Sequence, residues 1–451
     1  MHSMTRKRWI NLTLFITLFI ILVLSPFLLA GPTCDCILGC KGGTEQSYLN
    51  GPVEEEWTER YRCNGDGHDS IRAMVIDSMS NVYVTGSGDC SGGHSLLAFF
   101  NNALDDYMTV KYNADGKRLW VASYGGTKTY SQDKAFDLAI DGMGNVYVTG
   151  GSLVWGKQRE DGITMRREDG ITIKYDSAGY QLWTANYSIG SNEYSNEYAG
   201  MRAIAVDKGG NVYVTGTAAT VKYDADGNQL WARATTGEKI CVDQLGNIYV
   251  MRNNGVVKHD RDGNQLWIVY FDIVYKGFGG VRDMVIDDSG NVYITGLSNQ
   301  VSTTIKYSSD GEEIWVVSNN ASNAIALDEA GNVYVTGHSK GDYVTVKYDN
   351  DGTMLWVAEY HGMGYDITID DLGNVYVTGQ SDEECTTIKY NREGDQQWVA
   401  RYDGGLSDYG GNIAIDGLGN VYIAGSTDVK ECWNVGSYVQ YSEYLVIKYS
   451  Q

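Results

Sequence analysis

The heptapeptide GNVYVTG occupies residues 144–150 and returns unchanged at residues 210–216, 331–337 and 373–379. With close variants included, the string NVYVTG begins eight times, at Asn81, Asn145, Asn211, Asn247, Asn291, Asn332, Asn374 and Asn420. An Asp stands four residues before each of these Asn, and a Lys-aromatic step resembling TVKYD follows each copy. Internal repeats with periods of this size are typical of solenoids and propellers, so they decide the fold before any single motif does.

Each repeat has the pattern of four short strands. In the third copy the first three strands are AIAVD (203–207), NVYVTG (211–216) and TVKYD (220–224). The fourth strand of a copy resembles LWVASY, which is residues 119–124 of the first copy. Val and Tyr alternate with Thr or Lys at the period of a strand, and the Asp and Gly between strands favour tight turns. Four antiparallel strands per repeat without a helical pattern indicate the blade of a β-propeller.

A Trp follows the Lys-aromatic step in every copy except the last, and the missing Trp lies upstream of the first copy. Trp57 followed by Tyr61 reproduces the Trp-x-x-x-Tyr spacing of later copies. We predict that Trp57 to Tyr61 pair beside Leu445 to Tyr449 as the outer strand of the last blade, which removes the free sheet edges. The predicted fold is therefore all-β, an eight-bladed propeller of four-stranded antiparallel blades closed by its N-terminal strand. A linear array of hairpins is the alternative, but it would not need complementary ends.

These residues carry a family resemblance. GNVYVTG, preceded by IAVD and followed by TVKYD and LW, resembles the bacterial and archaeal β-propeller repeat family known as SBBP repeats, over nearly all of the chain after Trp57. The resemblance implies a surface or secreted propeller. It implies no single activity, because that family has no common catalytic residue to carry over.

The N-terminus predicts export. The basic residues 6–8 precede an uncharged, largely apolar run from Trp9 to Ala30, which is long enough to span a bilayer as a helix. The basic flank stays inside, so the rest of the chain is expected at the cell surface or outside the cell, membrane-anchored or secreted. Cleavage of the segment and lipidation at Cys34 both stay open.

Three regions follow from these patterns. Residues 1–30 are predicted to be a signal anchor or signal peptide in a transmembrane or signal helix, residues 31–56 a Cys-containing stalk, and residues 57–451 the propeller. The chain has 57 Asp and Glu against 35 Lys and Arg, a net charge of −22. This acidic balance argues against a nucleic-acid partner, because phosphate recognition needs a basic surface. We expect a monomer that contacts the membrane through its N-terminal segment.

Long connections fall on one face of the predicted ring. The turns between first and second strands and between third and fourth strands are short, whereas the long insertions 87–106, 151–170 and 426–443 lie in connections on the opposite face. Long connections on a rigid scaffold are where binding usually occurs. The sequence REDGIT occurs twice in and beside the second insertion, at 159–164 and 167–172, and predicts one extended hairpin there.

The candidate ligand-binding residues map to this long-loop face; they are Trp155, Trp433, His68, His94, His338 and His361. The two Trp could stack on a sugar or anchor a partner protein, or each could cover its own loop. The His could form a metal site or a general base, or serve no function. We predict no catalytic residue, no metal and no cofactor. The Asp-x-Asp-Gly turn at Asp224 resembles a calcium loop, but Thr235 stands where such a loop needs Glu.

Eight Cys in an exported chain permit disulfides. If the ring closes as predicted, four of them lie around the seam where the last blade meets the first. These four are the disulfide candidates Cys63, Cys90, Cys385 and Cys432. A bridge from Cys63 to Cys90 or Cys432 would tie the ends of the ring together. The alternative is that all four are free thiols.

The sequence favours a binding module over an enzyme. It predicts that the long-loop face binds a ligand or an extracellular protein or glycan. One alternative is a carbohydrate-active enzyme, a polysaccharide lyase or hydrolase that uses the same face. Such an enzyme should gather paired carboxylates with His or Arg at one mouth of the ring, and the sequence shows no such constellation at a signature spacing. A purely structural surface or adhesion protein is the other alternative.

Overall fold

The computed structural model describes residues 46–63, 69–89, 105–125, 131–158, 164–189, 197–271, 280–298, 301–434 and 437–451. The chain divides into two compact units, residues 43–430 with 440–451, and residues 1–42 with 431–439. The larger of the two units forms the propeller. The predicted N-terminal helix of residues 1–30 lies outside the described residues. Among the residues that are described, no helix is long and apolar enough to cross a bilayer.

Four consecutive strands form each of blades 1 to 7, and each strand pairs antiparallel with the next. Blades 1 and 2 consist of β3 (Ser70–Ile76), β4 (Val82–Asp89), β5 (Asp105–Tyr112), β6 (Arg118–Tyr124), β7 (Ser131–Ile140), β8 (Val146–Gln158), β9 (Thr164–Tyr175) and β10 (Gln181–Tyr187). Blades 3 and 4 consist of β12 (Met201–Val206), β13 (Val212–Gly216), β14 (Thr220–Tyr223), β15 (Gln229–Arg233), β16 (Lys239–Val242), β17 (Ile248–Arg252), β18 (Gly255–His259) and β19 (Gln265–Tyr270). The short strand β11 (Glu197–Tyr198) pairs parallel with β9.

The second half of the ring continues this pattern. Blades 5 and 6 consist of β20 (Gly280–Ile286), β21 (Val292–Ser298), β22 (Val301–Tyr307), β23 (Glu313–Asn319), β24 (Ala324–Leu327), β25 (Val333–Ser339), β26 (Asp342–Tyr348) and β27 (Met354–His361). Blade 7 consists of β28 (Met363–Ile369), β29 (Val375–Ser381), β30 (Glu384–Tyr390) and β31 (Gln396–Asp403), with β1 (Gln46–Asn50) as an added outer strand. Blade 8 consists of β32 (Ser407–Ile415), β33 (Val421–Asn434), β34 (Ser437–Ser450) and β2 (Glu54–Tyr61).

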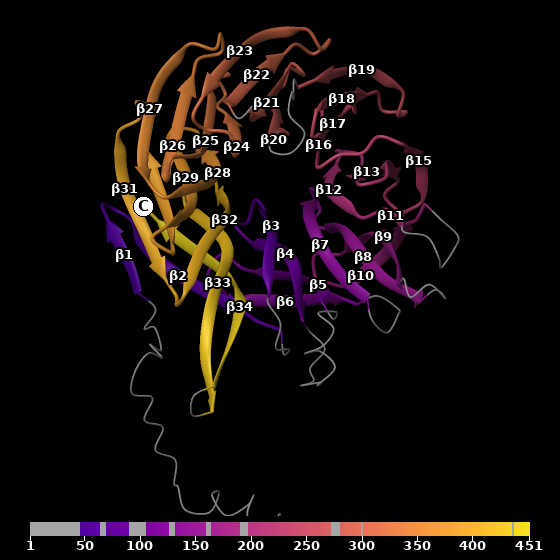
Figure 1. The fold of residues 1–451 in the computed structure, drawn as a ribbon, viewed down its shortest axis with the longest axis horizontal. Helices are drawn as coiled ribbons and strands as arrows, with labels where there is room; N and C mark the ends of the chain where they lie inside the picture. The colour runs from indigo at the N-terminus through magenta and orange to yellow at the C-terminus, as the bar shows by residue number, and fades with distance from the viewer. Residues whose placement is uncertain are drawn as a thin grey trace, which may run out of the picture. The chain divides into compact units, whose positions relative to one another are not determined.

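The eight blades close into a ring. The first strand of each blade contacts the first strand of the next, and β32 of blade 8 contacts β3 of blade 1. Strand β2 pairs antiparallel with β34, with Trp57 opposite Lys448 and Tyr61 opposite Tyr444. Figure 1 shows the colours running once around the ring, with the indigo N-terminal strands beside the yellow C-terminal strands. The predicted fold and its closure by the strand of Trp57 are therefore confirmed.

One Asp per repeat builds the turn between the first and second strands. In blade 2, Asp141 Oδ1 accepts the N–H groups of Met143 and Asn145, both at 2.9 Å. Asp141 Oδ2 accepts the Asn145 amide at 2.7 Å and the Tyr147 hydroxyl at 3.0 Å. Gly144 takes a φ of 78°, which glycine adopts without steric cost. Burial alone would raise the pKa of Asp141, but these hydrogen bonds lower it, so the carboxylate is charged at neutral pH.

The repeated Lys and Trp bind neighbouring blades together. Lys111 Nζ and Trp120 Nε1 of blade 1 both donate to the backbone carbonyl of Ser177 in blade 2, each at 3.2 Å. The Lys111 ammonium also lies 4.8 Å from the centre of the Tyr83 ring. A Cβ atom at Gly179 would lie 2.8 Å from the Trp120 ring, so the turn needs glycine there. These contacts join neighbouring blades, so the repeated Lys, Trp and Gly have a structural role that needs no ligand.

The insertions differ from simple loops. Residues 151–158 of β8 and 164–170 of β9 pair as an extended hairpin up to Gln158 opposite Thr164, as predicted. Residues 426–443 were expected as a long connection, but they belong mostly to β33 and β34, which are 14 residues each. The reason is the density of Val, Thr, Tyr and Trp in that segment, since β-branched and aromatic residues favour strands. We call the face with these connections the long-loop face, and the other face the tight-turn face.

Candidate functional site

The structure describes the side chains of only two of the six binding residues predicted from the sequence. His68 and His94 lie outside the described residues. Trp155 lies in β8 opposite Arg166, and Trp433 lies in β33, with both side chains outside the described part of the structure. The predictions for these four residues therefore stay predictions. His338 and His361 have described side chains, and both lie at the long-loop ends of blade 6.

His361 lies between two hairpin turns at the junction of blades 6 and 7. Its Nδ1 is 3.5 Å from Asp342 Oδ1 in the blade 6 hairpin, and its Nε2 is 3.3 Å from Asp382 Oδ1 in the blade 7 hairpin. The side chains are well exposed, at 66% for His361, 48% for Asp342 and 59% for Asp382. The imidazole therefore links two blades and remains accessible to a binding partner.

Arg401 extends this cluster along blade 7. It donates from Nη2 to Asp382 Oδ2 at 2.7 Å, and its Nε lies 2.7 Å from Glu384 Oε2. The hydrogen bond from Arg401 lowers the pKa of Asp382. Asp382 and Glu383 have φ values of 52° and 68°, a left-handed conformation that non-glycine residues adopt only with support from their surroundings. We call Asp342, His361, Asp382, Glu384 and Arg401 the 6–7 cluster.

His338 lies apart from these ion pairs. Its Nδ1 is 3.2 Å from the Asn323 amide nitrogen, which also donates to the carbonyl of Gly364 at 2.8 Å. The structure thus assigns His338 a contact with the first strands and His361 a place in the charged cluster. No group of three or more His, Cys, Asp or Glu among the described residues is arranged to hold a metal ion.

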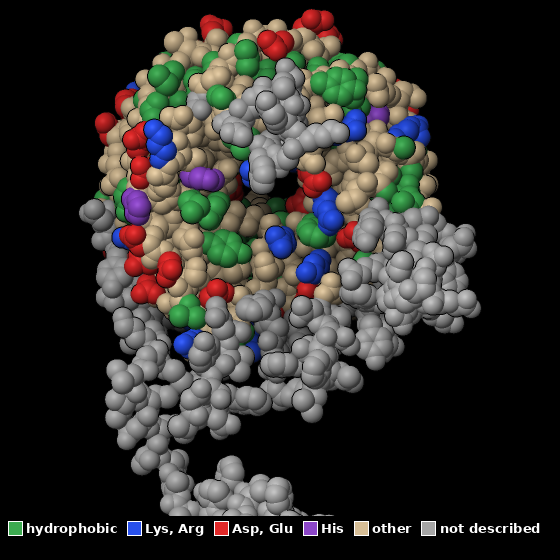
Figure 2. Space-filling model, in the orientation of Figure 1, with side chains coloured by type: hydrophobic (Ala, Val, Ile, Leu, Met, Phe, Trp, Pro, Cys, Tyr) green, Lys and Arg blue, Asp and Glu red, His purple; other side chains and the backbone are tan. Residues whose placement is uncertain are grey.

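A hollow opens at the middle of the ring. Figure 2 shows it on one face, with Lys and Arg side chains along its rim. The residue four positions before the turn Asp of each first strand is, in blade order, Ala73, Asp137, Ala203, Lys239, Asp283, Ala324, Asp366 and Asn412, and the three Ala belong to the hydrophobic core. The carboxylates of blades 2, 5 and 7 are the titratable acids of this set, and Lys239 is its base.

These three carboxylates accept backbone N–H groups of the first strands, which form the inner edges of the blades. Asp366 Oδ1 accepts the N–H of Ile367 in its own strand, and Oδ2 accepts the N–H of Ile413 in the next blade, both at 2.9 Å. Asp137 and Asp283 bind the N–H groups of Ile204 and Ile325 of their next blades in the same way. An unpaired edge N–H is costly when water is excluded, so these Asp have a structural explanation.

Electrostatic contacts join these groups around the hollow. Lys239 Nζ forms an ion pair with Asp283. Burial alone would lower the pKa of Lys239, but Asp283 raises it. Burial raises the pKa of Asp137 and of Asp366 to about 6, against the hydrogen bonds that lower it. Cys241 in β16 is a free thiol whose pKa burial raises to about 11, so it is protonated at neutral pH.

The predicted cysteine seam requires a correction at one of its four members. Cys385 is a free and buried thiol in β30, not a loop cysteine. It packs against blade 8, where a Cβ at Gly410 would lie 3.1 Å from its sulfur, and burial raises its thiol pKa. Cys63 is buried, and its N–H donates to Asp69 Oδ2 at 2.7 Å. Cys90 and the side chain of Cys432 lie outside the described residues, so the bridge from Cys63 to either of them stays a prediction.

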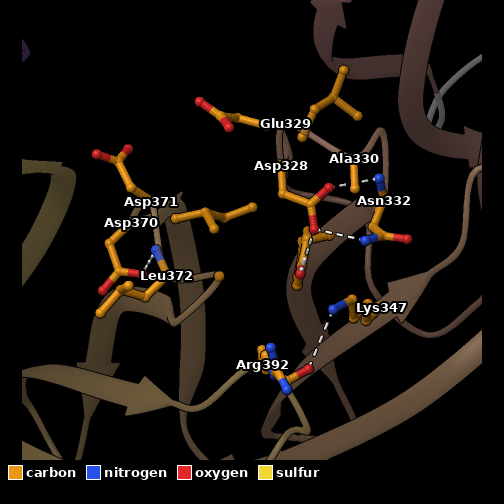
Figure 3. Close-up of a pocket in the computed structure, with 13 residues that line it drawn as sticks. Asp328, Glu329, Ala330, Asn332, Lys347, Asp370, Asp371, Leu372 and Arg392 are labelled. Atoms are coloured by element: carbon orange, nitrogen blue, oxygen red, sulfur yellow. Dashed lines mark hydrogen bonds between the residues drawn. The ribbon is translucent and has the colours of Figure 1, made fainter.

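The tight-turn face has a cleft between blades 6 and 7, with a volume of about 380 Å³. Figure 3 shows side chains of the two turns lining it, among them Glu329, Asp371 and Leu372. The polar groups deeper in the cleft already have partners in the repeat, since Lys347 Nζ donates to the Arg392 carbonyl at 3.2 Å. The exposed lining consists of acidic and apolar side chains together with Arg392, which forms an ion pair with Glu393.

Sequence reasoning missed the 6–7 cluster, the inner carboxylates and this cleft. The inner carboxylates had a signal, because aligning the eight repeats shows Asp at a position where other copies have Ala. The cleft also had a signal, in the Leu or Met at the tip of several turns. The 6–7 cluster had none, since it joins side chains from separate repeats through irregular hairpins.

Comparisons with known proteins support the repeat. Residues 321–343, 363–384 and 397–430 match the family described as Beta-propeller repeat (SBBP), so these segments of blades 6 to 8 are copies of that repeat, as predicted. No match is found among curated proteins.

Solved structures share the fold. BamB from Moraxella catarrhalis is similar with a TM-score of 0.54 and 12% identity, over 89% of this chain and 100% of that chain. Virginiamycin B lyase from Staphylococcus aureus is similar with a TM-score of 0.41 and 12% identity, over 78% of this chain and 99% of that chain. At these identities the likeness shows the propeller fold alone, and the TM-score of the lyase is too low to support an argument about activity.

Proposed function

We propose that this chain, whose residues 321–430 contain β-propeller repeats, is a binding module that takes a partner protein or glycan on its long-loop face outside the cytoplasm. The observation that carries the proposal is the 6–7 cluster. It presents an exposed imidazole and carboxylates on two hairpins at a fixed distance from each other. Exposed, oriented polar groups on a rigid scaffold favour recognition by hydrogen bonds.

Rigidity supports the same function. Lys and Trp side chains that donate to a turn carbonyl hold one blade to the next, as Lys111 and Trp120 do, and in blade 7 Lys389 and Trp398 donate to the Gln451 side chain instead. A surface that is ordered before binding loses less conformational entropy when the partner arrives. The apolar N-terminal run of residues 9–30 supports the extracytoplasmic location, because a basic flank followed by such a run is typical of exported chains.

A direct test screens the full-length chain against a glycan array and a protein array, and repeats the screen with two double variants. H361S/D382N removes the imidazole and one carboxylate of the cluster, and Asn is tolerated at the left-handed φ of residue 382. R392S/E393Q removes an exposed ion pair on the tight-turn face as a matched control.

We expect the bound partner to lose at least about tenfold in affinity with H361S/D382N and to be unaffected by R392S/E393Q, since charge-assisted contacts contribute strongly to recognition. An equal affinity for both variants, or the absence of any partner on either array, would contradict the proposal.

A further inference from the structure

The tips of the turns on the tight-turn face expose large apolar side chains. The residue two positions after the turn Asp is Leu or Met in five blades, and its exposed fraction is high: Met79 71%, Met143 78%, Leu245 80%, Leu372 78% and Leu418 85%. The turn does not require them, because Gly209 and Ser289 hold the same position in blades 3 and 5 with the same hydrogen bond to their Asp. These apolar side chains therefore need an explanation other than folding.

Four of the five tips belong to consecutive blades. Leu372, Leu418, Met79 and Met143 lie in blades 7, 8, 1 and 2, and we call them the apolar arc. Two of the turns that carry them, those of blades 1 and 8, are joined, since Ser80 Oγ donates to Asp416 Oδ2 at 2.8 Å. Each tip is also fixed by its own N–H bond to the turn Asp, at 3.0 Å for Leu372 and for Leu418. The arc is thus a preformed surface.

Acidic side chains flank one end of this arc, whereas the exposed Lys208 holds the same turn position in blade 3 at the other end. Asp371 adjoins Leu372, and Glu329 and Asp288 occupy the same position in the turns of blades 6 and 5, all exposed. Hydrogen bonds within the turns lower the pKa of Asp77, Asp141 and Asp416 despite their partial burial, so these carboxylates are also charged at neutral pH. Exposed apolar side chains with acidic groups at one end indicate an interaction site for a partner that carries basic groups.

We propose that the apolar arc and its acidic flank dock a segment of a partner protein that presents Leu-like and Lys- or Arg-like side chains together. Apolar anchors fit the exposed Leu and Met, which adapt to irregular surfaces, and basic side chains fit Asp371 and Glu329 beside the cleft. A second copy of this chain is a poorer fit, because it brings the same acidic flank. An anionic lipid surface is repelled for the same reason. This surface is separate from the 6–7 cluster on the other face.

The test measures fluorescence polarisation of labelled peptides with the full-length chain. The probe alternates Leu and Lys over about twelve residues, which is roughly 40 Å when extended. A Leu–Glu peptide and a Ser–Lys peptide of the same length separate the apolar from the basic contribution. The test variant is M79S/M143S/L372S/L418S, and its matched control is L182S/L230S/L266S on outer strands, where each Leu is 53% exposed.

We expect saturable binding of the Leu–Lys peptide, weaker binding of the Ser–Lys peptide and none of the Leu–Glu peptide. The four-residue variant should keep the wild-type melting temperature and bind the Leu–Lys peptide at least about tenfold more weakly, as loss of central anchors does at other interfaces. The control variant should bind like the wild type.

Three results would overturn the proposal. The first is absent or unsaturable binding of the Leu–Lys peptide, and the second is equal binding by the four-residue variant. The third is a wild-type dimer in sedimentation velocity that the four-residue variant abolishes, because the occupant would then be a second copy. None of these results depends on the partner of the long-loop face.

Discussion

At the scale of single residues, one carboxylate per repeat organises four other groups. Asp370 accepts the N–H groups of Leu372 and Asn374, the Asn374 amide and the hydroxyl of Tyr376, whose ring is fully buried. The neighbouring Asp371 is exposed and lies outside this network. The invariance of the turn Asp across eight repeats thus has a physical cause, which is the pairing of otherwise unsatisfied donors.

Replacing Asp370 by Ala should therefore destabilise the ring by about 1–3 kcal/mol, because a buried Tyr hydroxyl and two backbone N–H groups lose their acceptor. Urea unfolding followed by Trp fluorescence measures the change. D371A is the matched control and should stay within about 0.5 kcal/mol of the wild type. Equal effects of the two substitutions would show that the network contributes nothing.

The inner carboxylates predict an unusual pH dependence. Burial raises the pKa of Asp137 and Asp366 to about 6, while Lys239 and Asp283 face the same hollow. A raised pKa means that the folded state holds the proton more tightly than the unfolded state. The contribution to stability is therefore present at low pH and lost as the pH rises through about 6.

We expect the D137N/D366N variant to lose this dependence. Its free energy of unfolding should change less between pH 5 and pH 7.5 than that of the wild type, by an amount on the order of 1–2 kcal/mol. Urea unfolding at several pH values measures the slope. An unchanged slope would mean that other groups set the pH dependence in this range.

At the scale of elements, the N-terminal strands and Gln451 complete the contacts of blades 7 and 8 where the repeat lacks a turn. Blade 8 has no turn between its third and fourth strands, because its third strand is β34 and its fourth strand is β2, near the other end of the chain. The Gln451 side-chain oxygen replaces the backbone carbonyl of that missing turn. It accepts hydrogen bonds from Trp398 Nε1 at 3.2 Å and from Lys389 Nζ at 2.6 Å. Gly51, next to β1, packs against Trp398, which is only 1% exposed.

The Q451A variant should therefore lower the free energy of unfolding by about 1–2 kcal/mol, because two donors lose their acceptor at the closure. The control is S450A, the preceding residue, which should have little effect. Differential scanning calorimetry of the full-length chain compares the two. A melting temperature that is the same for both variants would contradict the role assigned to Gln451.

Elements repeated eight times were predictable, and contacts between repeats were not. The strand pattern and the turn Asp recur in every repeat, and Trp57 supplies the Trp that the last repeat lacks. A single sequence therefore suffices to find all three. Arg401, Asp382 and His361 meet because blades 6 and 7 stand side by side, and no spacing in the chain encodes this. Cys385 was placed in a connection, but the strand begins one residue earlier, at Glu384, and turns the thiol into the core.

At the scale of the whole molecule, the two faces of one ring are chemically distinct. The long-loop face carries the 6–7 cluster, and the tight-turn face carries the apolar arc with its acidic flank. The ring keeps these surfaces apart, so the two proposed partners would not compete for the same surface. The net charge of −22 favours basic over acidic partners.

The ends of the ring also predict a covalent link. We expect Cys63 in a disulfide with Cys90 or Cys432, since the sequence predicts all three at the junction of blades 8 and 1, and the predicted export would bring the chain into oxidising conditions. Peptide mapping without reduction identifies the pair. Cys385 serves as an internal control, because it is buried and free and should be recovered alkylated only after unfolding. Recovery of Cys63 as a free thiol would remove this prediction.

The central claim is that β2 completes blade 8, because the assignment of every residue to a face depends on that closure. Thr58 lies directly opposite Ile447 in the pairing of β2 with β34. Cysteines at such opposed positions are close enough to form a disulfide. Mass spectrometry of oxidised T58C/I447C is therefore the most direct measurement, with T58C/I388C as the control, since Ile388 holds the equivalent position in blade 7. We predict a cross-link within one molecule for T58C/I447C and none for the control. Equal cross-linking of the two variants, or a link only between molecules, would contradict the closed ring.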